Sequence, residues 1–157
     1  MVNYSLMKEQ LRALADGVPY LVSNLSNACA LIYDTLDRLN WAGFYLMQDG
    51  GLVLGPFQGK TACTQIAVGK GVCGTSVFEN RTIRVDNVHE FPGHIACDSA
   101  SNSEIVIPIR QDGKVIGVLD IDSPEFSRFS EDDQKGLEEF VSVLESIIKE
   151  SKLLSAF

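Results

Sequence analysis

The sequence has little positive charge. Its 157 residues include 13 lysines and arginines against 21 aspartates and glutamates, a formal net charge of −8. An acidic chain repels phosphate backbones, so nucleic acid is not expected as a partner. There is no apolar run of the roughly 18–20 residues that a bilayer-spanning helix needs, and the opening MVNYSLMKEQ lacks the basic-then-apolar pattern of an export signal. We therefore expect a cytoplasmic protein without membrane association.

Closely spaced cysteine pairs are also missing. None of the four cysteines belongs to a C-x-x-C pair, which leaves a zinc knuckle poorly supported. In a reducing compartment such cysteines are core, metal or redox residues rather than a disulfide framework. One alternative that the sequence leaves open is a zinc site built from Cys63, Cys73, Cys97 and either His89 or His94.

Repeats, low-complexity tracts and linkers are absent too, so we expect a single domain over residues 1–157. Apolar residues at three- and four-residue spacing predict helices over 5–15, 18–39 and 130 to about 153. Between them the pattern predicts two hairpins, 41–47 with 51–57 and 104–110 with 114–122. Short strands at 65–68 and 82–85 and a helix within the glycine-rich segment 69–80 complete the prediction. The fold class is α+β, with the helices on one sheet face.

Alternation along the strands divides their side chains between two faces. The aliphatic faces suit the terminal helices, and the other face carries Trp41, Tyr45, Glu104, Asp120 and Asp122. Two aromatic rings with three carboxylates suit a small ligand that bears an ammonium group. Repulsion and partial burial would raise the pKa of at least one carboxyl group, which could then donate a proton near neutral pH. The alternative is an ordinary polar face with a stray Trp and Tyr.

The cysteines occupy different settings. Cys29 lies on the apolar stripe of a predicted helix, so we expect it in the core. Cys73 opens the helix after the glycines, where a helix N-terminus favours thiolate, although a small residue packed under a turn would look the same. Cys63 lies in a predicted loop, and Cys97 lies in GHIACDSASNSE, a stretch too polar for a core. The backbone N–H groups of the glycine-rich turn 69–74 could hold an anion such as a carboxylate.

Several stretches resemble a known family, the single-domain GAF proteins that are free methionine-(R)-sulfoxide reductases. They are LNWAGFYLM, LGPFQGKTAC, IAVGKGVCGTSV, VHEFPGHIACDSASNSEIVIPI and GVLDIDSPEFSRFSEDD. The resemblance extends from about residue 20 to 150. Its most specific element is the cysteine spacing, because Cys63, Cys73 and Cys97 match the three family cysteines.

The resemblance implies a six-stranded antiparallel sheet, a homodimer and recycling by thioredoxin. It makes Trp41 and Tyr45 pocket walls, and it gives Cys97 the role of nucleophile with Cys63 or Cys73 resolving. It further implies that free methionine sulfoxide is bound and polarised by Glu104, Asp120 and Asp122. Two thiols supply both electrons, so no metal or organic cofactor is expected. The alternative function is a non-catalytic GAF domain that senses a small molecule.

Overall fold

Eleven short elements follow one another along the part of the chain that the computed structural model describes, residues 1–95 and 97–152. They are α1 (Tyr4–Ala15), α2 (Leu21–Thr35), β1 (Trp41–Gln48), β2 (Gly51–Gly59), β3 (Gln65–Ile66), α3 (Gly71–Glu79), β4 (Ile83–Val85), the 3₁₀ helix η1 (Val88–Glu90), β5 (Ser103–Gln111), β6 (Lys114–Ser123) and α4 (Glu131–Glu150). The six strands form one sheet in the order β3-β2-β1-β6-β5-β4. Every neighbouring pair is antiparallel, as predicted.

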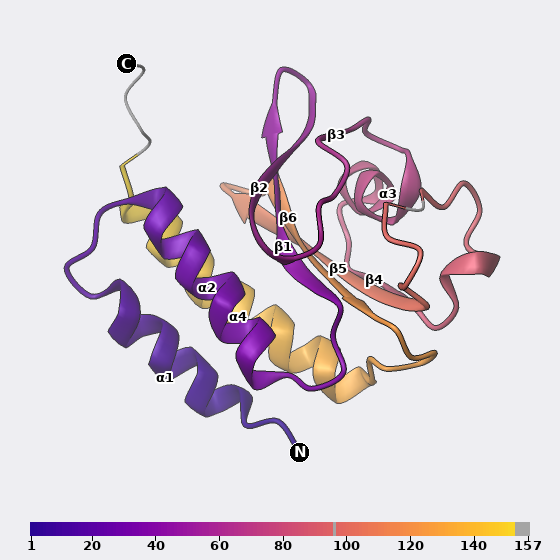
Figure 1. Ribbon diagram of the computed structural model, residues 1–157. Coiled ribbons are helices and arrows are strands. Elements are labelled where there is room, and N and C mark those ends of the chain that lie inside the picture. Colours follow the sequence, from indigo (N-terminus) through magenta and orange to yellow (C-terminus); the bar gives the residue numbers. More distant parts are fainter. Residues whose placement is uncertain (96, 153–157) are drawn as a thin grey trace.

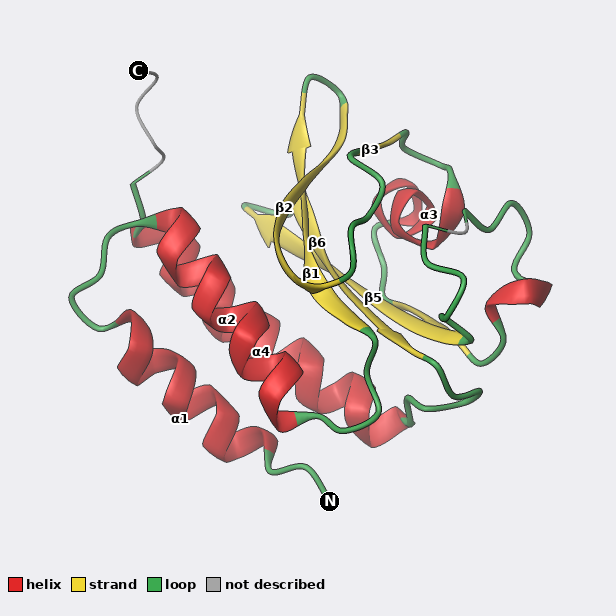
Figure 2. Cartoon of the chain, viewed as in Figure 1, coloured by secondary structure: helices red, strands yellow, loops and turns green. Residues whose placement is uncertain are grey.

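Helices α2 and α4 cover one face of the sheet, and α1 packs on their outer side (Figures 1 and 2). Between these helices and the sheet lies a core that contains the predicted aliphatic strand faces, including Phe44, Ile107 and Leu119. The predicted assignment of side chains to the two faces is therefore confirmed. Cys29 is fully buried in this core, also as predicted.

The opposite face holds a second apolar cluster under α3 and the loops that surround it. Trp41 and Tyr45 belong to this cluster, together with Val106 and Val118 from the central strands. The sheet is thus apolar on both faces at its centre.

Three elements end earlier than predicted. Helix α2 covers only Leu21–Thr35 of the predicted 18–39, because the chain must leave the helix for the backbone N–H of Asn40 to reach Asp122 O at 3.0 Å. Strand β3 stops at Ile66, before the left-handed Gly69 (φ 84°). Helix α4 begins after the Ser130 cap as predicted but ends at Glu150, and residue 153 lies outside the described residues.

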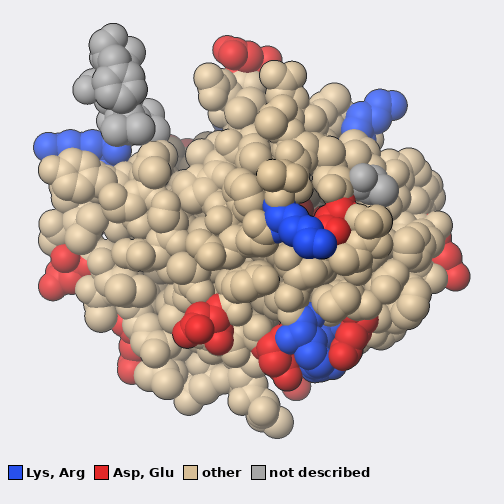
Figure 3. All heavy atoms as spheres, viewed as in Figure 1, with Lys and Arg blue, Asp and Glu red and all other residues tan. Residues whose placement is uncertain are grey.

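One face of the molecule shows how the charged side chains of the described residues are distributed. In Figure 3, lysine and arginine side chains are few and separated from one another on the face shown. Among the described residues, no helix is both long and apolar enough to cross a membrane.

Gly43 provides a test of how closely the second face is packed. A Cβ at this position would overlap Phe57 and lie 2.8 Å from the Trp41 ring. We expect Gly43→Ala to lower the free energy of unfolding by about 1–3 kcal/mol, as overpacking does. Urea denaturation would measure it. Gly51→Ala is the matched control because its Cβ would meet only Ile66 O, at 3.5 Å; equal stability of the two variants would contradict the prediction.

Candidate active site

The strand register brings the three predicted carboxylates together at the centre of the sheet. Asp122 of β6 lies between Trp41 of β1 and Glu104 of β5, its partners on the two sides. Asp120, two residues before it on β6, points to the same face. The exposed fractions of Glu104, Asp120 and Asp122 are only 7%, 6% and 9%. The sequence-based grouping of these side chains is therefore what the structure shows.

Burial dominates the electrostatics of this acid cluster, which consists of Glu104, Asp120 and Asp122. Desolvation raises the pKa of all three carboxyl groups, and repulsion by neighbouring carboxylates raises the pKa of Glu104 and Asp122 further. Oδ1 of Asp120 is buried and has no hydrogen-bond partner among the described residues. The raised pKa values favour the protonated forms of these carboxyl groups, so the cluster can donate a proton as well as bind a cation.

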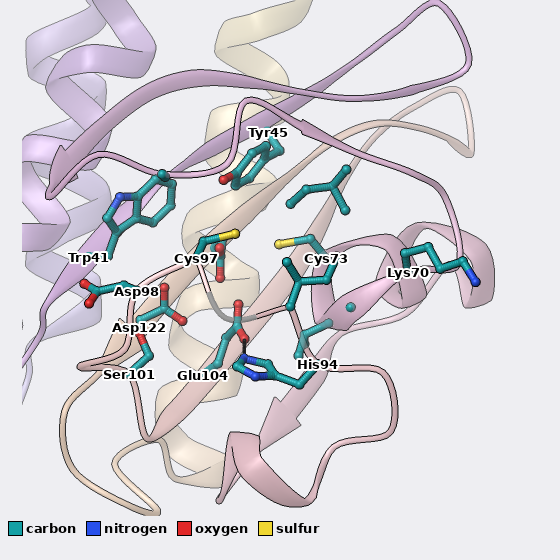
Figure 4. Close-up of a pocket in the computed structure, with 16 residues that line it drawn as sticks. Trp41, Tyr45, Lys70, Cys73, His94, Cys97, Asp98, Ser101, Glu104 and Asp122 are labelled. Carbon is teal, nitrogen blue, oxygen red and sulfur yellow. Dashed lines mark ion pairs between the residues drawn. The ribbon is translucent and has the colours of Figure 1, made fainter.

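A pocket opens above the acid cluster (Figure 4). Strands, the start of α3 and the loop before β5 all contribute to its walls. Its lining consists of Trp41, Tyr45, Ala62, Ile66, Lys70, Gly71, Val72, Cys73, His94, Ile95, Cys97, Asp98, Ser101, Glu104, Asp120 and Asp122.

Two stacked aromatic rings form one wall. The Trp41 ring lies 5.8 Å from that of Tyr45 and 5.2 Å from that of Phe57, with interplanar angles of 24° and 16°. Trp41 Nε1 donates to Lys60 O at 3.1 Å, and the Tyr45 hydroxyl donates to Cys63 O at 2.9 Å. The wall thus combines apolar faces toward the pocket with two polar contacts that hold the segment 60–63 in place.

A disulfide joins Cys63 to Cys97, with their Cα atoms 5.6 Å apart. Cys97 lines the pocket, whereas Cys63 lies outside the lining formed by the described residues. The sequence leaves open whether Cys63 or Cys73 pairs with Cys97. With both sulfurs of the observed pair in a disulfide, the alternative zinc site, which needs three cysteines, does not match this form of the protein.

Cys73 is free and buried beside the acid cluster. Its Sγ and one carboxylate oxygen each of Glu104 and Asp120 lie within 4.8 Å of one another, the one such set of three potential metal donors among the described residues. Burial, then the charges of Asp120 and Glu104, hold the pKa of the Cys73 thiol well above its ordinary value. The expectation that the start of a helix would favour thiolate here is therefore wrong, because desolvation and negative neighbours outweigh the helix dipole.

The start of α3 faces the pocket as predicted from the glycine-rich turn. Lys70 occupies the N-cap position, and its side chain accepts no hydrogen bond from the helix. The backbone N–H groups of the first helical turn have no intrahelical acceptor, and Gly71 and Val72 line the pocket. The first turn of α3 therefore presents a partial positive charge and free backbone N–H donors, which suit an anionic group.

Sequence reasoning missed the lining residues Asp98 and Ser101, and it named His94 only as a possible zinc ligand. All three lie in GHIACDSASNSE, so its unusual polarity was the available signal. His94 Nε2 lies 4.0 Å from Glu104 Oε1. Burial lowers the pKa of His94, and burial together with the neighbouring carboxylates raises that of Glu104, so the neutral form of each group is favoured.

The raised pKa of Glu104 has a measurable consequence for stability. The folded protein holds a proton that the unfolded chain releases above about pH 4.3, so this group makes stability fall as the pH rises toward its folded pKa. We expect Glu104→Gln to exceed the parent in unfolding free energy at pH 8, on the order of 1 kcal/mol, and to lose that advantage near pH 4. Denaturation at both pH values, with Glu9→Gln on α1 as control, would check it; a Gln variant less stable at pH 8 would contradict it.

Comparison with known proteins places this site in a family. The GAF domain family model matches residues 22–149. The free methionine-R-sulfoxide reductase of Escherichia coli strain K12 is 51% identical over 145 residues, which cover 92% of this chain and 88% of that protein.

Two solved structures of free methionine-R-sulfoxide reductases have the same fold as this chain. The structure of fRMsr of Staphylococcus aureus in its reduced form superposes with a TM-score of 0.91 at 51% identity, covering 94% of this chain and 96% of that one. The free methionine-R-sulfoxide reductase of Neisseria meningitidis, in complex with its substrate, has a TM-score of 0.91 at 40% identity, covering 94% and 89%. The chain belongs to the GAF domain family and, within it, to the free methionine-R-sulfoxide reductases.

Proposed function

We propose that this protein reduces free methionine-R-sulfoxide to methionine, with Cys97 as the attacking thiol. The family makes it an oxidoreductase, and relatives from Escherichia coli and Saccharomyces cerevisiae are named for this activity. The observation that carries the proposal is the Cys63–Cys97 disulfide at the wall of a pocket with three buried carboxyl groups. That arrangement supports a mechanism in which a redox-active sulfur and a proton donor act on one small ligand.

The pocket suits the two charged ends of a free amino acid. Carboxylates among the acid cluster accept hydrogen bonds from the ammonium group, and the start of α3 donates to the α-carboxylate. Trp41 and Tyr45 enclose the S-methyl end. A methionine sulfoxide residue within a peptide has neither charged group free, so buried partners in the pocket would stay unpaired. This is the physical basis that we propose for selectivity toward the free amino acid.

The chemistry balances with two thiols. The Cys97 thiolate attacks the sulfoxide sulfur while a protonated carboxyl group of the acid cluster donates to the sulfoxide oxygen. Methionine leaves, and the oxygen remains on Cys97 as a sulfenic acid. The Cys63 thiol then attacks the Cys97 sulfur, the oxygen leaves as water, and the disulfide forms. An external dithiol, which we propose is thioredoxin, returns both cysteines to thiols by exchange.

Cys73 is a poor candidate for the attacking or resolving role. Its thiol is buried, and its raised pKa leaves little thiolate near neutral pH. The disulfide pairs Cys97 with Cys63 instead. We therefore assign the resolving step to Cys63 and leave Cys73 as a small side chain packed beside Glu104 and Asp120.

The domain content, oligomeric state and cellular location of the enzyme are also part of the proposal. We propose that the whole chain is one GAF domain, that it acts as a homodimer, and that it works in the cytoplasm, where dithiol reductants are maintained. It needs no metal or organic cofactor, because the two cysteines transfer both electrons.

Cysteine variants separate the two proposed steps. We expect Cys97→Ser to abolish methionine release with a thioredoxin system. Cys63→Ser should release about one methionine per subunit and then stop with a sulfenic acid on Cys97, because the resolving thiol is missing. Mass spectrometry after dimedone labelling would identify that adduct, and Cys29→Ala, in the core, is the control. Near-normal turnover by Cys97→Ser would overturn its role as nucleophile.

Substrate scope tests the function itself. Methionine release should be measured from each separated sulfoxide epimer, both as the free amino acid and within a peptide. We expect turnover of the free R epimer and at least about a hundredfold less from the peptide, consistent with the discrimination that unpaired buried polar groups give. Binding without any turnover would favour the ligand-sensing alternative.

A further inference from the structure

Asn40 connects the acid-bearing strand to the loop that carries Cys97. It directly precedes β1, and its backbone N–H donates to Asp122 O at 3.0 Å. Its side-chain Nδ2 donates to Asp98 Oδ2 at 2.9 Å and to Ser101 Oγ at 3.0 Å. A single residue therefore contacts the backbone beneath the acid cluster and two residues of the loop.

The orientation of the Asn40 amide follows from its partners. A carboxylate can only accept a hydrogen bond, so the NH₂ group must face Asp98. Oδ1 of Asn40 is then left buried without a partner among the described residues. Asp98 in turn uses its other oxygen, Oδ1, to accept from the N–H of Ala100 at 2.9 Å, which shapes the turn just after Cys97.

The disulfide is a second connection between the Cys97 loop and the rest of the site. In the oxidised protein the bond to Cys63 ties the loop covalently to the segment that Tyr45 holds. After reduction that tie is gone, yet Cys97 must stay above the acid cluster and within reach of Cys63. We propose that Asn40 is a positioning residue that holds the Cys97 loop in the reduced enzyme through its hydrogen bonds to Asp98 and Ser101.

The consequence for turnover rests on the proposed function, but the consequence for the disulfide does not. A loop held in place keeps the two thiols at a high effective concentration, which favours the disulfide over the dithiol. Loss of the Asn40 contacts should therefore make the disulfide easier to reduce, even in the absence of any sulfoxide.

An exchange of the two hydrogen-bonding partners provides the test. Asn40→Asp is almost isosteric, but it places a carboxylate against Asp98 in place of the donor. Asp98→Asn in the same chain restores a donor, now pointing the opposite way. The new amide at position 98 can donate to the new carboxylate at position 40 while its oxygen still accepts from Ala100. Asn27→Asp, on the exposed side of α2, adds the same charge far from the loop and is the control.

The measurement is the equilibrium of the Cys63–Cys97 disulfide with dithiothreitol, followed by alkylation and mass spectrometry. We expect Asn40→Asp to shift it about tenfold toward the dithiol, typical of a lost hydrogen bond to a charged group, and the double variant to recover most of this. The kcat for sulfoxide reduction should fall and recover in parallel, with a smaller change in KM.

The outcomes can be separated. An unchanged redox equilibrium in Asn40→Asp, or no recovery in the double variant, would overturn the proposal. Equal losses of melting temperature in the oxidised and reduced forms, without a redox shift, would show a merely structural role and also overturn it. A redox shift with rescue in a protein that turns over no sulfoxide would support the role of Asn40 and refute the proposed function instead.

Discussion

The burial of three carboxyl groups on an otherwise apolar sheet face is the constraint on which the rest of this site depends. Glu104, Asp120 and Asp122 lie among Val106, Val118 and two aromatic rings, where charge is poorly solvated. Burial, and after it the repulsion between the carboxylates, raises the pKa of Glu104, and burial with the same negative charges raises the pKa of the nearby Cys73 thiol. The same burial makes the site attractive to a ligand that brings its own positive charge. In the proposed mechanism, binding and proton donation therefore have a single physical origin.

Antiparallel register makes this concentration of charge possible. Neighbouring strands place Trp41, Asp122 and Glu104 in one row, so that the backbone pairing alone brings together residues from distant parts of the sequence. The opposite face of the same strands is aliphatic and packs on α2 and α4. The packing against α2 and α4 thus supports the face that carries the three acids. A change of register by one residue would turn those acids toward the aliphatic core on the other face.

Much of this arrangement could be predicted from sequence, because strand alternation is a local rule that Trp41, Tyr45 and the three acids obey. The helix boundaries were harder, since α2 ends where Asn40 must meet Asp122, a tertiary requirement invisible to periodicity. The pairing of Cys97 with Cys63 also depends on how two loops approach each other in space. The state of the Cys73 thiol was predicted wrongly for a similar reason: the helix start is visible in sequence, whereas the surrounding burial is not.

The two aromatic wall residues have a second attachment whose implications reach beyond binding. Trp41 and Tyr45 line the pocket, and their polar atoms donate hydrogen bonds to the backbone carbonyls of Lys60 and Cys63. In the proposed mechanism, the same two side chains therefore shape the substrate wall and help to position the resolving sulfur. Under that mechanism, a substitution that widens the wall for a larger sulfoxide would also displace the cysteine that regenerates the catalyst. The proposed specificity and recycling would therefore have to change together.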